Sequence, residues 1–189
     1  MAGNIIFYRE WLPLGKRDFR ILTMLADTGI FQGNLTALCG YLSLRPGQKK
    51  TNAALRESIE FLTVNGYITS TLTGRRYRLE IVPKEQPIKV ARRWFNDVMQ
   101  ADSYSETVSW EMVVKTLVWI SGNSLGNLVV NDMIAAELNT SVDTLGAAKN
   151  VLFNDFHSII REIEKITLPN GEKRNRGQRL AVYADWSGE

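Results

Sequence analysis

The order of the secondary-structure elements that this sequence predicts is repeated once along the chain. Residues 17–82 contain three helical patterns followed by two β-rich segments, and residues 108–183 contain the same order. Each helical pattern gathers apolar residues on one face, and turn-forming residues separate the patterns. A chain of 189 residues is long enough for two small domains, each with its own core. The sequence therefore predicts an α+β, mainly helical fold built from two similar domains.

Apolar periodicity and capping residues predict three helices in the first half of the chain. One helix covers 17–28 and is followed by Gly29, which suits a helix C-terminus. The second starts after Asn34, a good N-cap, and carries apolar residues at helical spacing over 35–42. The third runs from about Lys49 to Asn65-Gly66. Three amphipathic helices in succession favour a small helical core.

Strand signals surround and follow these helices. Ile30-Phe31 forms a short strand pattern, and residues 67–72 and 77–82 are rich in β-forming residues on either side of Thr73-Gly74-Arg75. The last two segments predict a β-hairpin that ends at Pro83. A linker is expected over Pro83–Pro87.

The second half predicts a similar set of elements after a short helix around 90–99. Residues 108–120 are strongly apolar and predict a buried helix. Asn131 is expected to cap the next helix, and Thr140 or Ser141 the one after it. The remaining expected segments are a β-rich stretch at 158–168, a polar loop at 169–178 and a return strand at 180–183.

These segments divide the chain into three parts. Residues 1–83 are expected to form an N-terminal domain, with a short extended arm at residues 5–14. Residues 84–107 are expected to be a linker and a connecting helix, and residues 108–189 a C-terminal domain.

Composition excludes several classes of protein. No apolar run approaches the ~18 residues that span a bilayer, and the first ten residues lack the pattern of a secretory signal, so we expect a cytoplasmic protein without a membrane partner. A single cysteine, Cys39, and a single histidine, His157, exclude an internal disulfide and a multi-ligand Cys or His metal site. Neither residue has a catalytic motif around it, and no P-loop is present. We expect no enzyme activity, cofactor or metal.

Three helices followed by a β-hairpin is the element order of the winged helix-turn-helix. The chain resembles proteins with two such domains in tandem, over about 16–83 and 108–185. One such group comprises the replication and regulatory proteins of plasmids and integrated mobile elements, which bind DNA. Another comprises the kleisin-associated subunits of bacterial condensin, which grip a partner protein. The resemblance implies a double-stranded DNA-binding protein that acts in transcription regulation, DNA replication or plasmid maintenance. The alternative is a non-enzymatic scaffold for protein interactions.

In a helix-turn-helix protein the third helix lies in the major groove, and its first residues meet the base edges. If Leu55, Ile59 and Leu62 face the core, the opposite face of this helix is polar and basic. Asparagine pairs with adenine and arginine or lysine with guanine, while lysine and threonine also bind phosphates. The candidate DNA-contacting residues of this helix are Lys49, Lys50, Thr51, Asn52 and Arg56.

The first hairpin is also basic. Gly74 allows a tight turn, and Arg75, Arg76 and Arg78 could lie in or beside the minor groove. Basic hairpin tips also arise as protection of an edge strand. Basic residues outnumber acidic ones in the first half of the chain and not in the second, which favours the first half as the contact with a polyanion.

The residues of the second domain predict a surface that is less suited to DNA than that of the first domain. Its third helix carries Asp143, which would repel phosphate, and the small residues Gly146 and Ala147, which suit close packing. Its hairpin could still contact a phosphate backbone through Lys173, Arg174 and Arg176. Three alternatives stay open for this domain: a homodimer interface, a protein-partner surface and a weaker second DNA contact.

Overall fold

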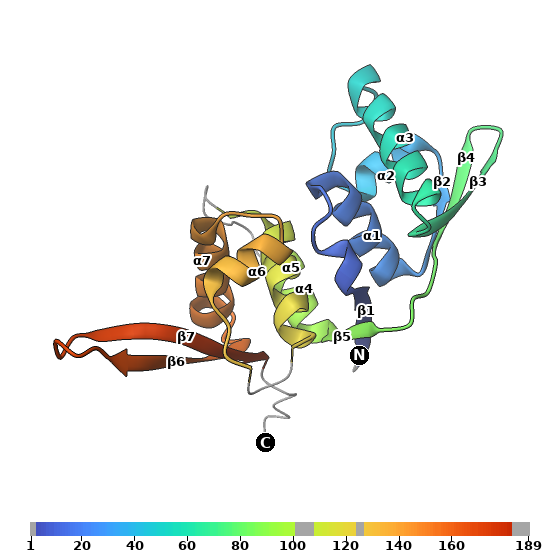
Figure 1. Ribbon diagram of the computed structural model, residues 1–189. Coiled ribbons are helices and arrows are strands. Elements are labelled where there is room, and N and C mark those ends of the chain that lie inside the picture. The colour runs from blue at the N-terminus through green and yellow to red at the C-terminus, as the bar shows by residue number, and fades with distance from the viewer. Residues whose placement is uncertain (1–2, 101–107, 124–126, 183–189) are drawn as a thin grey trace. The chain divides into compact units, whose positions relative to one another are not determined.

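The computed structural model describes residues 3–100, 108–123 and 127–182. These residues contain seven α-helices, seven β-strands and three small antiparallel sheets, so the α+β class is confirmed. The chain divides into two compact units, drawn in Figure 1. Unit 1 comprises Met1–Pro13 with Pro87–Glu189, and unit 2 comprises Leu14–Gln86. Unit 2 is therefore inserted into the sequence of unit 1.

The helices of unit 2 match the sequence prediction closely. They are α1 (Lys16–Thr28), α2 (Leu35–Tyr41) and α3 (Lys49–Val64). Gly29 ends α1 with a φ of 81°, a left-handed conformation that glycine adopts at little cost. Asn34 Oδ1 accepts a hydrogen bond from the Ala37 amide at 2.9 Å and caps α2. The caps predicted for α1 and α2 are confirmed.

One three-stranded sheet covers these helices. It contains β2 (Ile30–Gly33), β3 (Ile68–Thr73) and β4 (Arg76–Ile81) in the order β2-β4-β3. The hairpin β3–β4 is the one that the sequence predicts, and β2 extends the expected short strand. The central strand β4 contributes Leu79, which is fully buried and lies opposite Phe31 and Ser70. The core of unit 2 includes Phe19, Leu22, Leu25, Leu38, Leu55, Leu62, Ile68 and Leu79.

The N-terminal segment belongs to unit 1. Strand β1 (Asn4–Tyr8) pairs antiparallel with β5 (Pro87–Ala91), and a single 3-10 turn (Arg9–Trp11) follows it. Phe7 and Trp11 are fully buried, and the Phe7 ring lies against those of Trp11 and Phe95. This differs from the expected arm of an N-terminal domain, because the apolar residues of the segment complete the core of the other unit.

The described part of the expected linker and connecting helix, residues 84–100, contains a strand as well as a helix. Residues 87–91 are β5, and α4 (Arg92–Gln100) follows it directly. Trp94, Phe95 and Val98 are buried in unit 1. Residues 101–107 lie outside the described residues.

Three further helices complete the core of unit 1. They are α5 (Trp110–Ser121), α6 (Asn131–Glu137) and α7 (Val142–Asn150), and a π-helical turn (Val151–Asp155) extends α7. Residues 113–120 of α5 are all buried, as their apolar character predicts. Ser141 Oγ accepts from the Thr144 amide at 3.1 Å and caps α7. The predicted cap at Asn131 is wrong: Val130 occupies that position, and the Asn131 side chain bonds to other elements.

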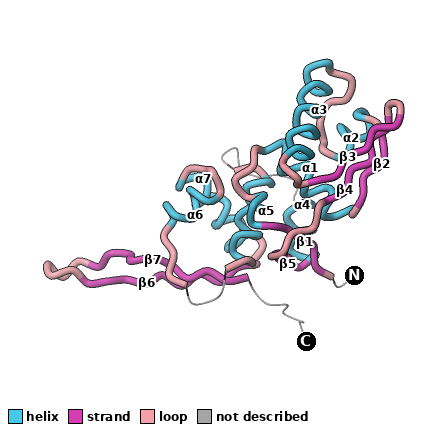
Figure 2. The backbone as a smooth tube through the Cα atoms, turned by 45° about the vertical axis from the view of Figure 1, so that its right-hand side comes forward, coloured by secondary structure: helices cyan, strands magenta, loops and turns pink. Residues whose placement is uncertain are grey.

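A long hairpin ends unit 1. Strands β6 (Ile159–Thr167) and β7 (Lys173–Val182) pair antiparallel, and Figure 2 shows them extending beyond helices α5, α6 and α7. The segment predicted as a polar loop at 169–178 is mostly strand, because its polar residues lie on a solvent-exposed ladder. Val129, between α5 and α6, bridges to Gln178 on β7. In unit 2, β2 lies between the first two helices and pairs with β4, so both units repeat one pairing scheme.

No helix in the described parts of the chain is long and apolar enough to cross a membrane.

Candidate nucleic-acid interface

Helix α3 is anchored along its apolar side and exposed along its basic side. Leu55, Ile59 and Leu62 are buried, as predicted, and Ser58 is buried beside them. Arg17 Nη1 on α1 donates to the carbonyl of Ala54 at 3.2 Å and ties the two helices together. The sequence-predicted contact residues Lys49, Lys50 and Arg56 are exposed, and Thr51 and Asn52 are half-buried.

A groove of about 580 Å³ joins α3 to the β3–β4 hairpin and the start of α2. Asn52 and Arg56 line it from α3, and Arg75 lines it from the hairpin turn. Three residues that the sequence placed in two separate motifs therefore share one surface. The groove also contains polar residues that sequence reasoning missed as interface residues, namely Asn34, Thr36 and Tyr77.

Asn52 has an unusual environment in this groove. Its side-chain oxygen, Oδ1, is buried and has no hydrogen-bond partner among the described residues. A buried amide oxygen without a partner costs free energy, about 1–3 kcal/mol in mutational data. A rotation of the side chain that exposed Oδ1 to an incoming donor would recover that cost.

The three arginines of the hairpin do not share one face. Gly74 adopts a φ of 62° in the turn, and Arg75 follows it. Side chains alternate along a strand, and Leu79 points into the core, so Arg76 and Arg78 lie on the opposite face of β4 from the helices. Arg78 Nε also donates to Glu80 Oε1 at 2.6 Å. Arg75 is thus the hairpin arginine that joins Asn52 and Arg56.

The basic residues predicted on the second hairpin differ in their pairing. Lys173 and Arg174 are exposed at the start of β7. Arg176 Nη1 donates to Glu164 Oε1 on β6 at 2.9 Å, and Arg179 Nη2 donates to Oε2 of the same carboxylate at 3.2 Å. This carboxylate partly neutralises the middle of the hairpin, so its positive charge is concentrated near the turn.

The lysine of α7 is buried, which the sequence did not indicate. Lys149 is 2% exposed, and its Nζ donates to Asn131 Oδ1 at 2.5 Å and to Gln178 Oε1 at 3.1 Å. Burial, and to a smaller extent the nearby positive charge of Arg161, lower the pKa of Lys149 from 10.5 to about 8. Lys149 is therefore inside the unit rather than on a surface that could meet DNA.

The single cysteine and the single histidine belong to different units. Cys39 is fully buried in unit 2, and burial raises the pKa of its thiol. His157 is exposed in unit 1, at a φ of 49°, and its Nδ1 lies 3.1 Å from the carbonyl oxygen of Phe153. The described residues contain no group of three or more His, Cys, Asp or Glu side chains that could hold a metal ion.

Comparison with protein-family models, curated proteins and solved structures found no match to this chain. The function must therefore be inferred from the chain's own residues. The groove of unit 2 is the strongest candidate, because it combines an exposed helix start, two arginines and an unpartnered amide oxygen.

Proposed function

We propose that unit 2 is a winged helix-turn-helix domain that binds double-stranded DNA. The shared lining of one groove by Asn52, Arg56 and Arg75 carries this proposal. The three helices, the hairpin and the pairing of β2 with β4 support the same architecture. In such a domain the third helix enters the major groove, which has room for one α-helix.

Each residue has a role in this proposal. Asn52 would pair with adenine and Arg56 with guanine, the bases whose edges match these side chains. Arg75 would lie beside α3 in the adjacent minor groove or on its phosphates. The exposed Lys49 and Lys50, with Thr51, would bind backbone phosphates, which add affinity without sequence preference.

We propose a second winged helix in unit 1, because α5, α6, α7 and the β6–β7 hairpin repeat the order and the Val129–Gln178 bridge repeats the pairing. Lys173 and Arg174 would give this unit a weaker contact with the phosphate backbone, with Arg176 nearby. The chain as a whole would act as a sequence-specific DNA-binding protein in transcription regulation, or in replication or maintenance of a mobile element. A homodimer would suit a two-fold operator.

Fluorescence anisotropy with a labelled random duplex of about 30 base pairs tests this proposal at three salt concentrations. We expect micromolar affinity at low salt that weakens steeply as salt increases, because counterions are released from the phosphates. The variant Arg56→Ala/Arg75→Ala should bind more weakly. The matched control Lys89→Ala/Arg93→Ala removes two exposed positive charges from unit 1 and should bind as the wild type does. Absence of binding at low salt would refute the proposal.

The alternative, a protein-interaction scaffold, has one observation in its favour. An added Cβ at Gly146 on α7 would meet nothing within 4 Å, so the backbone of this helix is open to a close partner. Co-purification of a stoichiometric protein partner, with no salt-dependent DNA binding, would favour the scaffold. Replacing Gly146 with leucine should then abolish that partner's binding.

A further inference from the structure

Unit 1 contains a buried positive charge that has no carboxylate beside it. The ammonium group of Lys149 is bonded to the side-chain oxygens of Asn131 and Gln178, which are both neutral amides. Among the described residues, no carboxylate forms an ion pair with Lys149. A buried charge without a counter-charge is costly, so the site is suited to an external anion.

A cavity of about 180 Å³ lies against this network. Its polar lining residues are Asn131, Arg161, Asn175, Arg176 and Gln178, and its apolar lining residues include Val129, Val130 and Ile163. A water molecule's share of liquid volume is about 30 Å³, so the cavity has room for a tetrahedral phosphate group. The two amide residues that hold Lys149 are therefore also part of the cavity wall.

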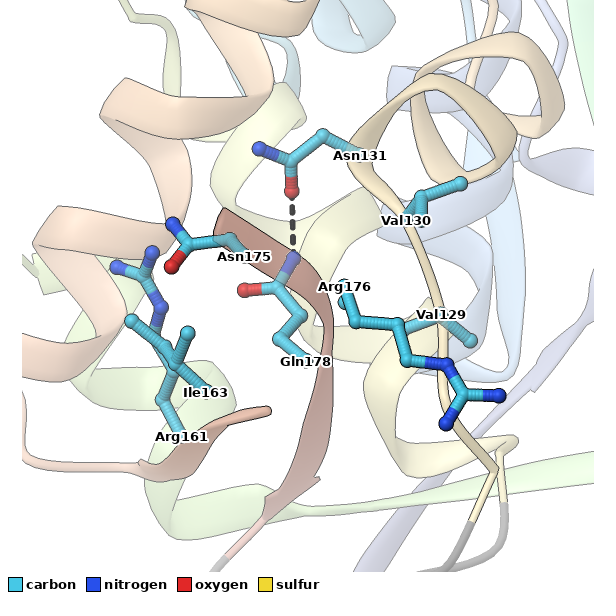
Figure 3. Close-up of a pocket in the computed structure, with 9 residues that line it drawn as sticks. Val129, Val130, Asn131, Arg161, Ile163, Asn175, Arg176 and Gln178 are labelled. Carbon is cyan, nitrogen blue, oxygen red and sulfur yellow. Dashed lines mark hydrogen bonds between the residues drawn. The ribbon is translucent and has the colours of Figure 1, made fainter. Parts of the chain in front are cut away.

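Arg161 adds a second cation to the same cavity. Its Nε is buried and has no hydrogen-bond partner among the described residues. In Figure 3 the side chains of Arg161 and Asn175 appear on the same side of Gln178, whereas the guanidinium of Arg176 extends on the other side. Arg176 is already paired with Glu164. Arg161 is thus a cavity-lining guanidinium that no described carboxylate neutralises.

The amide orientations favour an anion as well. Lys149 can only donate hydrogen bonds, so the oxygen of Asn131 must face it. The same oxygen accepts from Gln178 Nε2 at 2.5 Å, which leaves the amino group of Asn131 as a donor. The cavity therefore offers donors from Arg161, Asn131 and Asn175 and a buried positive charge behind its wall. Guanidinium groups bind phosphate oxygens particularly well.

We propose that this cavity in unit 1 binds a phosphate group, with Arg161 and Asn175 as direct donors and with Lys149 as the buried charge that Asn131 and Gln178 hold against the cavity wall. This site lies outside the groove proposed for base recognition, and its occupant is recognised by its charge and its oxygens. The phosphate belongs either to a small phosphate ester or to a DNA backbone, and both present the same chemistry to the cavity.

Strand β6 supplies a matched pair of variants for a test. Ile163 and Ile166 have similar exposure, 43% and 40%, so a glutamate is tolerable at either position. Ile163 shares a strand face with Arg161 and lines the cavity, whereas Ile166 lies on the opposite face. A carboxylate at 163 would occupy Arg161 and repel an anion. The same charge at 166 would not reach the cavity.

Isothermal titration calorimetry of the full chain with inorganic phosphate, against acetate and chloride at matched ionic strength, tests the proposal. We expect saturable phosphate binding in the wild type and in Ile166→Glu, and at least about tenfold weaker binding in Ile163→Glu and in Arg161→Gln. Circular dichroism of each variant verifies folding. Phosphate binding no stronger than acetate binding, or equal binding in Ile163→Glu and Ile166→Glu, would overturn the proposal.

Anisotropy measurements of duplex DNA binding by the same variants identify the source of the phosphate. Because Ile166 lies opposite Arg174, a glutamate there has its own small effect on duplex binding. If Ile163→Glu weakens duplex binding clearly more than Ile166→Glu does, the cavity takes a DNA backbone phosphate. If Ile163→Glu loses inorganic phosphate while duplex affinity is unchanged, the cavity takes a small phosphate ester. Either result supports phosphate binding. The calorimetric arm requires no DNA, so a failure of the DNA-binding proposal would be seen separately.

Discussion

Asn52 on α3 and Arg75 in the β3–β4 turn line the same groove, although most of α3 and all of β3 lie between them in sequence. Folding of the hairpin back along the helix brings them together. An amide that can read a base edge and a guanidinium that can bind a phosphate are therefore on one surface. We therefore expect the Asn52 side chain to affect sequence preference and the Arg75 side chain to affect overall affinity.

Replacing Asn52 with alanine should reduce sequence preference. We expect a cost of about 1–3 kcal/mol on the preferred site and little change on random duplex, because an amide reads a base edge. Arg56→Ala should behave in the same way. Site selection followed by anisotropy on the selected and random duplexes measures both effects. An equal loss on the two duplexes would contradict the recognition role of these residues.

Arg75→Ala and Arg76→Ala are neighbouring changes that should differ in effect. Arg75 lines the groove with α3, whereas Arg76 lies on the far face of the sheet. Loss of Arg75 should weaken binding on all sequences and reduce the salt slope by about one unit, since it removes one phosphate contact. Loss of Arg76 should have the smaller effect. Salt titrations of the two variants provide the measurement, and identical slopes would show that both faces meet DNA.

Replacing Phe7 with alanine should destabilise unit 1 and leave unit 2 intact. Phe7 is fully buried and contacts Trp11 and Phe95, so its removal should cost about 3–5 kcal/mol. The tryptophans of the sequence all fall within the bounds of unit 1, and the single cysteine, Cys39, is buried in unit 2. Tryptophan fluorescence should therefore report unfolding of unit 1 at a lower urea concentration than in the wild type. The rate of Cys39 labelling should stay near that of the wild type. Faster labelling of Cys39 would indicate that the arm supports unit 2.

The buried lysine of α7 should make the stability of unit 1 depend on pH. In the folded chain the pKa of Lys149 is about 8, below its ordinary value of 10.5. Between these values the unfolded chain holds the proton and the folded chain does not, so stability should rise as pH increases from about 8 to 10. The slope of unfolding free energy against pH should be steeper in the wild type than in Lys149→Met, by up to about 1.4 kcal/mol per pH unit.

Urea unfolding followed by tryptophan fluorescence at several pH values from 7 to 10 measures this slope. The control Lys173→Met removes an exposed lysine from the same unit and should follow the wild type. Parallel curves for the wild type and Lys149→Met would show that Lys149 does not lose its proton in this range.

The sequence determined the features that depend on residues close together in the chain. Helices α1, α2 and α3 follow from apolar spacing, and the caps at Asn34 and Ser141 use hydrogen bonds to amides three residues ahead. The β3–β4 hairpin follows from β-forming segments around a glycine turn. Local preferences and a short loop suffice for such elements, so they could be predicted without knowledge of the fold.

Only the tertiary structure decided the relationships between distant segments. The pairing of β1 with β5 uses backbone groups that every residue carries, so periodicity does not reveal the partner. Whether Arg75 or Arg76 lines the groove depends on the register of the hairpin and on which face of the sheet the helices cover. Lys149 and Gln178 are buried together because Gln178 of the long hairpin accepts a hydrogen bond from Lys149 Nζ, and both side chains donate to Asn131 Oδ1. Their burial results from the packing of distant segments, so it could not be predicted from the residues next to them in the sequence.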